Sequence, residues 1–122
     1  MARSSKLRPL FWLGSTKSDL MALPASVIDT FGFGLYLAQI GTRHIQAKPL
    51  HGFGTAGVLE IVEDLQGNTY RAVYTVRFTT AVYVLHVFQK KSTHGIATPK
   101  PDMNLIKIRL KAAATHAAKE LS

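Results

Sequence analysis

Apolar and polar side chains alternate with the two-residue period of a β-strand over residues 58–88. In a strand, side chains two positions apart share one face of the sheet, so this alternation separates a core face from an outer face. The pattern predicts three consecutive strands at 58–64, 70–78 and 81–88, with a turn at 66–68. Strands joined by tight turns pair antiparallel, so we expect an antiparallel meander.

Apolar residues recur at helical spacing on both sides of this region. Over residues 19–40 the spacing predicts one helix, or a pair of helices broken near Leu23. Gly32 and Gly34 weaken that prediction, because a glycine inside a helix costs about 1 kcal/mol relative to alanine. A second helical pattern begins near Pro101. Its apolar stripe consists of Met103, Ile106, Leu110, Ala113 and Ala117.

The order of these elements indicates the fold class. The short apolar segment 7–13 predicts a first strand, whereas residues 42–57 are rich in glycine, proline and histidine and predict a loop. Strand, helices, three strands and helix together predict an α+β fold, an antiparallel-rich sheet with the N-terminal helices and a C-terminal helix packed on one face. With 122 residues and no repeat or linker, we expect residues 1–122 to form a single domain.

The chain is strongly basic, which favours a polyanionic partner. It carries 15 lysines and arginines against 7 aspartates and glutamates, with a net charge of +8 and a pI near 10.1. Nucleic acid is the first expectation, and a basic surface that only promotes solubility is the alternative. The absence of cysteine excludes disulfides, thiolate catalysis and cysteine-bound zinc. No apolar run has the length of a signal peptide or a membrane span, so we expect a cytoplasmic protein that does not bind membranes.

Three familiar site patterns are not expected to be functional here. Gly52, Gly54 and Gly57 spell G-x-G-x-x-G, but a predicted strand follows them where dinucleotide binding requires a helix. The five histidines have neither metal-ligand spacing nor a neighbouring carboxylate, so we expect no metal site and no Ser/His/Asp triad. No cofactor is expected either.

Candidate chemistry is concentrated in the hairpin 70–92, YRAVYTVRFTTAVYVLHVFQKKS. Arg71 and Arg77 share one face of the first strand, and the opposite face is the better core face. If helices cover the core face, both arginines are open to a phosphate backbone; the alternative is that they extend over a solvated surface. Periodicity does not decide which face of the sheet His86 lies on. His86 is either a catalytic residue or a hydrogen-bonded, partly buried side chain without a catalytic role. Lys90 and Lys91 end the last strand, beside whatever the open face binds.

Cations, an imidazole and tyrosines, with no carboxylate inside the hairpin, suit RNA chemistry. Cleavage of RNA by its own 2′-hydroxyl needs a base for that proton, an acid for the leaving 5′-oxygen and positive charge on the phosphorane, without a metal. Clustered cations can supply the charge, and their mutual repulsion would lower the pKa of a lysine.

Several sequence runs resemble one known family. KPLHGFG, VLEI, TYRAVYTVRF and VYVLHVFQKKS, followed by TPK and a lysine-bearing helix, resemble the phage-derived HigB-like branch of the RelE/ParE toxins of toxin–antitoxin systems. The likeness extends from about Lys6 to His116. It implies a small RelE-like domain and a metal-independent endoribonuclease that cuts mRNA on the translating ribosome. It also implies a cognate helix-turn-helix antitoxin (HigA-like) that blocks the toxin.

The resemblance implies roles for individual residues. By motif position, Arg71 matches the arginine that contacts the scissile phosphate in RelE-type nucleases, and Lys91 matches a basic residue after their last strand. We therefore expect Arg71, Lys91 and His86 to be catalytic, and Lys90 and Arg77 to bind RNA.

Two departures from the family pattern leave other hypotheses open. RelE has lysines on the strand where this chain has Glu60 and Glu63, so Glu60 or His86 would have to serve as the base. RelE's carboxy-terminal tyrosine has no counterpart, although His94 or Lys100 could lie nearby. One alternative function is ParE-like inhibition of DNA gyrase without RNA cleavage. The other is a non-toxic, phage-derived interaction protein.

Overall fold

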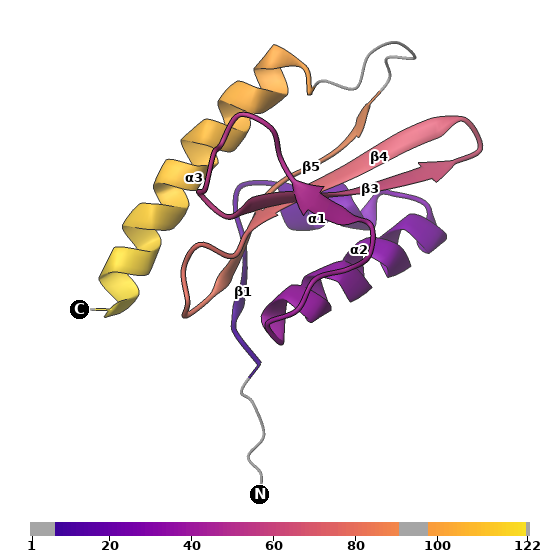
Figure 1. Cartoon of the computed structure of the whole chain (residues 1–122). Helices are drawn as coiled ribbons and strands as arrows, with labels where there is room; N and C mark the ends of the chain where they lie inside the picture. The colour runs from indigo at the N-terminus through magenta and orange to yellow at the C-terminus, as the bar shows by residue number, and fades with distance from the viewer. Residues whose placement is uncertain (1–6, 91–97, 122) are drawn as a thin grey trace, which may run out of the picture.

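The computed structural model describes residues 7–90 and 98–121 (Figure 1). Its elements follow the predicted order, with one additional strand. In chain order they are β1 (Leu10–Trp12), α1 (Thr16–Met21), α2 (Ala25–Gln39), β2 (Ala47–Pro49), β3 (Val58–Leu65), β4 (Asn68–Thr75), β5 (Val82–Lys90) and α3 (Lys100–Leu121).

The five strands form one mixed sheet in the order β1-β5-β4-β3-β2. The antiparallel meander of β3, β4 and β5 is confirmed, and β1 joins it parallel to β5. Gln66 and Gly67 form the predicted turn between β3 and β4, both with positive φ (51° and 83°), as a two-residue hairpin turn of type I′ requires. β2 lies within the predicted loop at the edge of the sheet, where the missing N–H of Pro49 is tolerated.

The N-terminal helical region is a pair of helices broken near Leu23. Pro24 is the N-cap residue of α2, and its carbonyl oxygen accepts hydrogen bonds from the N–H groups of Val27 and Ile28. A proline disfavours helical conformation at the residue before it, so Pro24 accounts for the break at Leu23. Leu20 of α1 and the apolar stripe of α2 are buried on the same face of the sheet.

That face forms the first hydrophobic core. The side chains of Val27 and Phe31 are fully buried there, together with Leu35 and Ala38. They pack against alternate residues of the central strands, namely Ile61, Ala72, Tyr74, Val82 and Val84.

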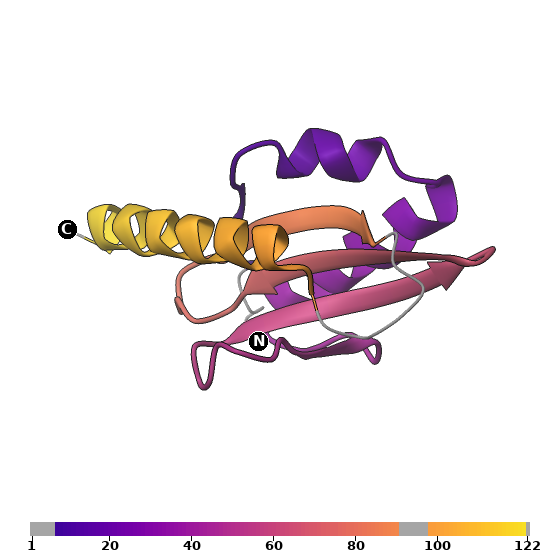
Figure 2. The same ribbon diagram turned by 90° about the horizontal axis from the view of Figure 1, so that it is seen from above.

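The opposite face forms a second core with α3. Ile106, Ala113 and Ala117, all from the predicted stripe, pack in one cluster with strand residues that include Val73 and Tyr83. Figures 1 and 2 show α3 on one side of the sheet and α2 on the other. The α+β class is confirmed, but the helices are divided between two faces where the prediction had them on one. The reason is that β4 and β5 are apolar on both faces, and both must be covered.

The glycine-rich loop between β2 and β3 has a structural explanation. Gly52, Gly54 and Gly57 all have positive φ (102°, 56° and 68°), which favours glycine at each position. A Cβ atom on Gly57 would also lie 3.2 Å from the backbone nitrogen of Arg77. The G-x-G-x-x-G run therefore joins two strands and does not open a helix.

Candidate functional site

Polar side chains gather on the α3 face of the sheet, next to the apolar contact with α3. Glu60, Arg71, His86 and Lys90 carry titratable groups, yet they are only 5–8% exposed. They lie on β3, β4 and β5, and Asp102 in the first turn of α3 contacts His86. We call these five residues the polar cluster. It contains three of the five residues that the sequence predicted for the site.

A β-bulge in β5 decides that His86 joins this cluster. Leu85 is the additional residue, because Val84 pairs with Tyr74 while His86 pairs with Val73. Strict alternation would have placed His86 on the same face as Val84, in the core with α2. The bulge instead shifts the alternation by one residue, so His86, Phe88 and Lys90 face α3 while Val87 faces the core with α2. Bulges are over-represented next to functional sites, where they re-aim a side chain.

Arg71 is held by a buried ion pair with Glu60. Its Nη1 atom donates a hydrogen bond to Glu60 Oε1 at 2.6 Å, and the two side chains are 7% and 6% exposed. The expectation that Arg71 lies on an open face is therefore corrected. The hairpin itself contains no carboxylate, but the neighbouring strand β3 supplies one. Glu60, a candidate base from the sequence, here fixes the position of the guanidinium.

Lys90 is the second cation of the cluster. It pairs across the strands with Thr69, which places it diagonally from Arg71 on the same face. Burial lowers the pKa of Lys90, the charge of Arg71 lowers that pKa further, and Glu60 acts in the opposite direction. The sequence predicted a lowered lysine pKa from neighbouring cations. The direction agrees, but burial is the larger cause.

His86 and Asp102 form a second pair within the cluster. Their Nε2 and Oδ1 atoms are 2.6 Å apart, and the imidazole stacks on the ring of Phe88 with centroids 4.5 Å apart. The Nδ1 atom of His86 is buried and has no hydrogen-bond partner among the described residues. Sequence analysis found no carboxylate beside a histidine, because Asp102 reaches His86 only when α3 packs on the sheet.

Of the other two predicted site residues, Arg77 lies away from the cluster and Lys91 lies outside the described residues. Arg77 follows the end of β4, is exposed, and places its guanidinium 5.8 Å from the ring centroid of Phe78. The end of β4 at Thr75 is already about 13 Å along the strand from Arg71. Because Lys91 and His94 lie outside the described residues, their positions near the site stay predictions.

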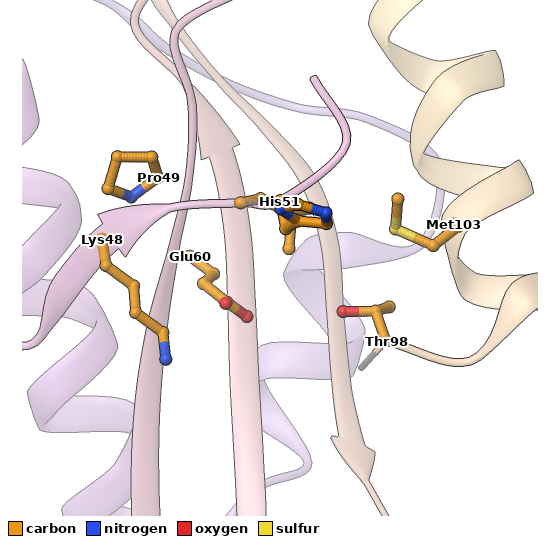
Figure 3. Close-up of a pocket in the computed structure, with 7 residues that line it drawn as sticks. Lys48, Pro49, His51, Glu60, Thr98 and Met103 are labelled. Carbon is orange, nitrogen blue, oxygen red and sulfur yellow. The ribbon is translucent and has the colours of Figure 1, made fainter. Parts of the chain in front are cut away.

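A pocket of about 470 Å³ opens beside the ion pair (Figure 3). Its lining residues are Lys48, Pro49, Leu50, His51, Glu60, Thr98 and Met103. Lys48 pairs with Glu60 across β2 and β3, so their side chains share the face that lines the pocket. Sequence analysis assigned no role to Lys48 or His51. They lie in the run KPLHGFG, and the three residues of β2 are too few to show a strand period.

The described residues contain no group of three or more histidine, aspartate or glutamate side chains placed to hold a metal ion. The same part of the chain has no helix that is both long and apolar enough to cross a membrane. The cluster's own side chains offer charge stabilisation and proton transfer.

Comparison with known proteins finds one family. The family model described as phage-derived protein Gp49-like (DUF891) matches residues 18–111. The matched stretch begins in α1 and ends in α3, so it includes every residue of the polar cluster. No curated protein and no solved structure matches the chain.

Proposed function

Because the chain belongs to the phage-derived Gp49-like family, which is related to RelE-type toxins, we propose that it is the toxin of a type II toxin–antitoxin system. In this proposal it is an mRNA interferase, a metal-independent endoribonuclease that acts on translating ribosomes in the cytoplasm. A cognate helix-turn-helix antitoxin of the HigA type neutralises it, as the HigB-like resemblance of the sequence implies.

One observation carries the nuclease proposal: Arg71 and Lys90 place two cations side by side in a setting that is largely removed from water. Positive charge acts more strongly on a phosphate there than it does in bulk water. In the proposed reaction, Arg71 stabilises the charge that develops on the phosphorane when the 2′-hydroxyl attacks the scissile phosphorus. Lys90 binds the RNA backbone, and Lys91 adds charge after the strand, as the resemblance implies.

The pair of His86 and Asp102 supports the proton transfers of this reaction. A carboxylate that holds one ring nitrogen fixes the orientation of an imidazole and leaves the other nitrogen to exchange a proton. Here Asp102 holds Nε2 and Nδ1 is buried, so the proton shared by the His86–Asp102 pair is the one assigned to acid–base chemistry. The net charge of +8 favours association with RNA and with the ribosome.

The test is a pulse of expression from a tightly repressed promoter, followed by growth measurement and mapping of new mRNA 5′-ends. Three variants are compared with the wild type: the double variant Glu60→Leu with Arg71→Met, Lys90→Met, and Lys17→Met as a control. The double variant removes both charges of the buried pair, so it avoids leaving one of them uncompensated. Lys17 is an exposed cation on α1, on the other face of the sheet, so its variant makes the same charge change as Lys90→Met but away from the cluster.

Growth arrest with new 5′-ends in the wild type and in Lys17→Met, and in neither cluster variant, supports the nuclease proposal. Circular dichroism of each purified variant confirms that it is folded. Arrest without new 5′-ends, accompanied by inhibition of DNA supercoiling, replaces the proposal with gyrase inhibition. Normal growth of the soluble wild type replaces it with a non-toxic interaction protein.

A further inference from the structure

The pocket beside the Glu60–Arg71 pair has a chemical character that the cleavage reaction alone does not explain. Its volume of about 470 Å³ lies in the range of pockets that take small organic ligands. Its lining combines apolar side chains with the opposite charges of Lys48 and Glu60 and the polar side chains of His51 and Thr98 (Figure 3). A phosphate group gains nothing from contact with apolar side chains, because its charge is stabilised by water or by cations.

Contacts between the loop after β2 and the start of α3 hold these walls. The N–H group of Leu50 donates a hydrogen bond to the carbonyl oxygen of Val58, which ties the start of the loop to β3. At Gly52, where φ is +102°, an added Cβ atom would lie 3.2 Å from the methyl carbon of Met103. The loop therefore closes against the first turn of α3, and Pro49, Leu50 and Met103 form an apolar lining whose shape exists without a ligand.

Two side chains of opposite charge supply part of the polar lining of the pocket. Lys48 and Glu60 are direct cross-strand partners, and both line the pocket. Lys48 can donate hydrogen bonds, and the Glu60 carboxylate can accept them. Glu60 also accepts the hydrogen bond from Arg71. A ligand in contact with Glu60 is thus one side chain away from the arginine assigned to the phosphate.

We propose that this pocket binds the base of a nucleotide next to the scissile phosphate, and this rests on the proposed function. A nucleobase is a flat ring with apolar faces and an edge that carries both donors and acceptors, and proteins read single-stranded RNA through these two features. Leu50 and Met103 contact the faces of the ring. Lys48 donates to a ring nitrogen or keto oxygen, and Glu60 accepts from an amino or imino group. Lys48 is then a specificity-determining residue.

The methionines provide a direct probe of binding. In protein labelled with ¹³C at the methionine methyl groups, Met103 reports on the pocket, and Met21, exposed on α1, is the internal control. The four nucleoside 3′-monophosphates are titrated separately, with ribose 5-phosphate and inorganic phosphate as probes without a base. We expect at least one nucleotide to shift the Met103 signal saturably while Met21 is unaffected. We also expect Lys48→Met to weaken this binding by at least about fivefold, and Lys17→Met to leave it unchanged.

These outcomes separate the pocket from the nuclease proposal. A base-dependent shift at Met103 supports the pocket even in a protein that cuts no RNA. Equal shifts with ribose 5-phosphate would mean that a phosphate occupies the pocket, which overturns the proposal. No shift with any nucleotide, in a protein that does cleave RNA, overturns it as well. In an active protein, Lys48→Met should also change the base preference at one position beside the cut and at no other.

Discussion

At the scale of single residues, the buried pair of Glu60 and Arg71 is the most unusual feature of this sheet. Two opposite charges lie 2.6 Å apart in side chains that are less than a tenth exposed. Removing two charges from water costs several kcal/mol each, so such a pair seldom adds net stability compared with apolar residues of the same size. The pair is better explained by what it holds in place, an arginine with a fixed guanidinium on the face of the polar cluster.

A double-mutant cycle tests this explanation. Glu60→Leu alone and Arg71→Met alone should each lower the free energy of unfolding, by about 3–5 kcal/mol at most, because each leaves one buried charge without its ion-pair partner. Glu60→Leu should cost more, because it leaves Arg71 beside Lys90, whereas Arg71→Met leaves Glu60 near a lysine of opposite charge. The double variant should recover most of the loss. Urea denaturation of the wild type, the two single variants and the double variant measures the three changes in unfolding free energy.

Additive losses in the double variant would show that the two side chains stabilise the fold separately. The interpretation that the ion pair positions Arg71 would then fail.

The matched control is Glu63→Leu. Glu63 lies on the same strand, is only partly buried, and accepts hydrogen bonds from the side chains of Gln46 and Thr30. Its removal leaves no buried charge without a partner, so its loss should be within about 1 kcal/mol.

At the scale of elements, helix α2 contains two glycines, Gly32 and Gly34, whose surroundings differ in the structure. Both Gly32 and Gly34 weaken a helix by propensity. A Cβ atom on Gly32 would meet nothing within 4 Å, whereas one on Gly34 would lie 2.3 Å from Cδ1 of Ile61. Ile61 is fully buried, so that methyl group has little space in which to move. Gly34 thus brings α2 close to β3.

The two glycines should therefore respond to alanine in opposite directions. Gly32→Ala should raise the free energy of unfolding by about 0.5–1 kcal/mol through helix propensity. Gly34→Ala should lower it by about 1–2 kcal/mol, because overpacking costs more than propensity returns. Ile61→Val removes the clashing Cδ1 atom, so Gly34→Ala should be less harmful in that background than in the wild type. Chemical denaturation measures each change, and equal effects of the two alanines would contradict the close contact.

The positions of most helices and strands could be predicted from the sequence, but the partners of the site residues could not. The meander and the stripe of α3 followed from local periodicity, and the structure confirms them. Of the two alternatives left for residues 19–40, the structure has the pair of helices broken near Leu23. The face of His86 could not follow, because one additional residue at Leu85 reverses the alternation and no sequence pattern marks such a bulge. The partners of Arg71 and His86 were also missed. Glu60 is on another strand and Asp102 on a helix, and only tertiary packing brings them near.

At the scale of the whole molecule, one sheet separates two cores and places the polar cluster at the border of the second. The strands 70–78 and 81–88 already carried apolar residues on both faces in the sequence, so the signal for a helix on each side was present. The prediction that all helices pack on one face assumed that the face carrying Arg71 is open to solvent. In the structure, α3 covers part of that face and contributes Asp102 and Met103 to the site. The position of α3 therefore links the stability of the second core to the geometry of the cluster.

The first core makes the stability of the molecule depend on pH in the alkaline range. Tyr74 is fully buried, and its hydroxyl has no hydrogen-bond partner among the described residues. Burial raises the pKa of Tyr74 from 10.0 to about 12, against a smaller opposing effect of Arg43. Above pH 10 the unfolded chain loses this proton while the folded protein keeps it, so ionisation favours unfolding. The Tyr74 hydroxyl thus has no effect on the pH dependence of stability below pH 10, and between pH 10 and 12 its titration lowers stability by about 2–3 kcal/mol at most.

Tyr74→Phe removes this titration and also a buried hydroxyl without a partner. The variant should be about 1 kcal/mol more stable than the wild type at pH 8, and the difference should grow as the pH rises from 10 to 12. Tyr36→Phe is the matched control, because Tyr36 lies on α2 and is 46% exposed, so its variant should follow the wild-type curve. Urea midpoints at pH 8, 10 and 11 measure the profile. Lysines titrate in the same range but are common to all three proteins, so a constant difference between Tyr74→Phe and the wild type would show that another group causes the alkaline loss.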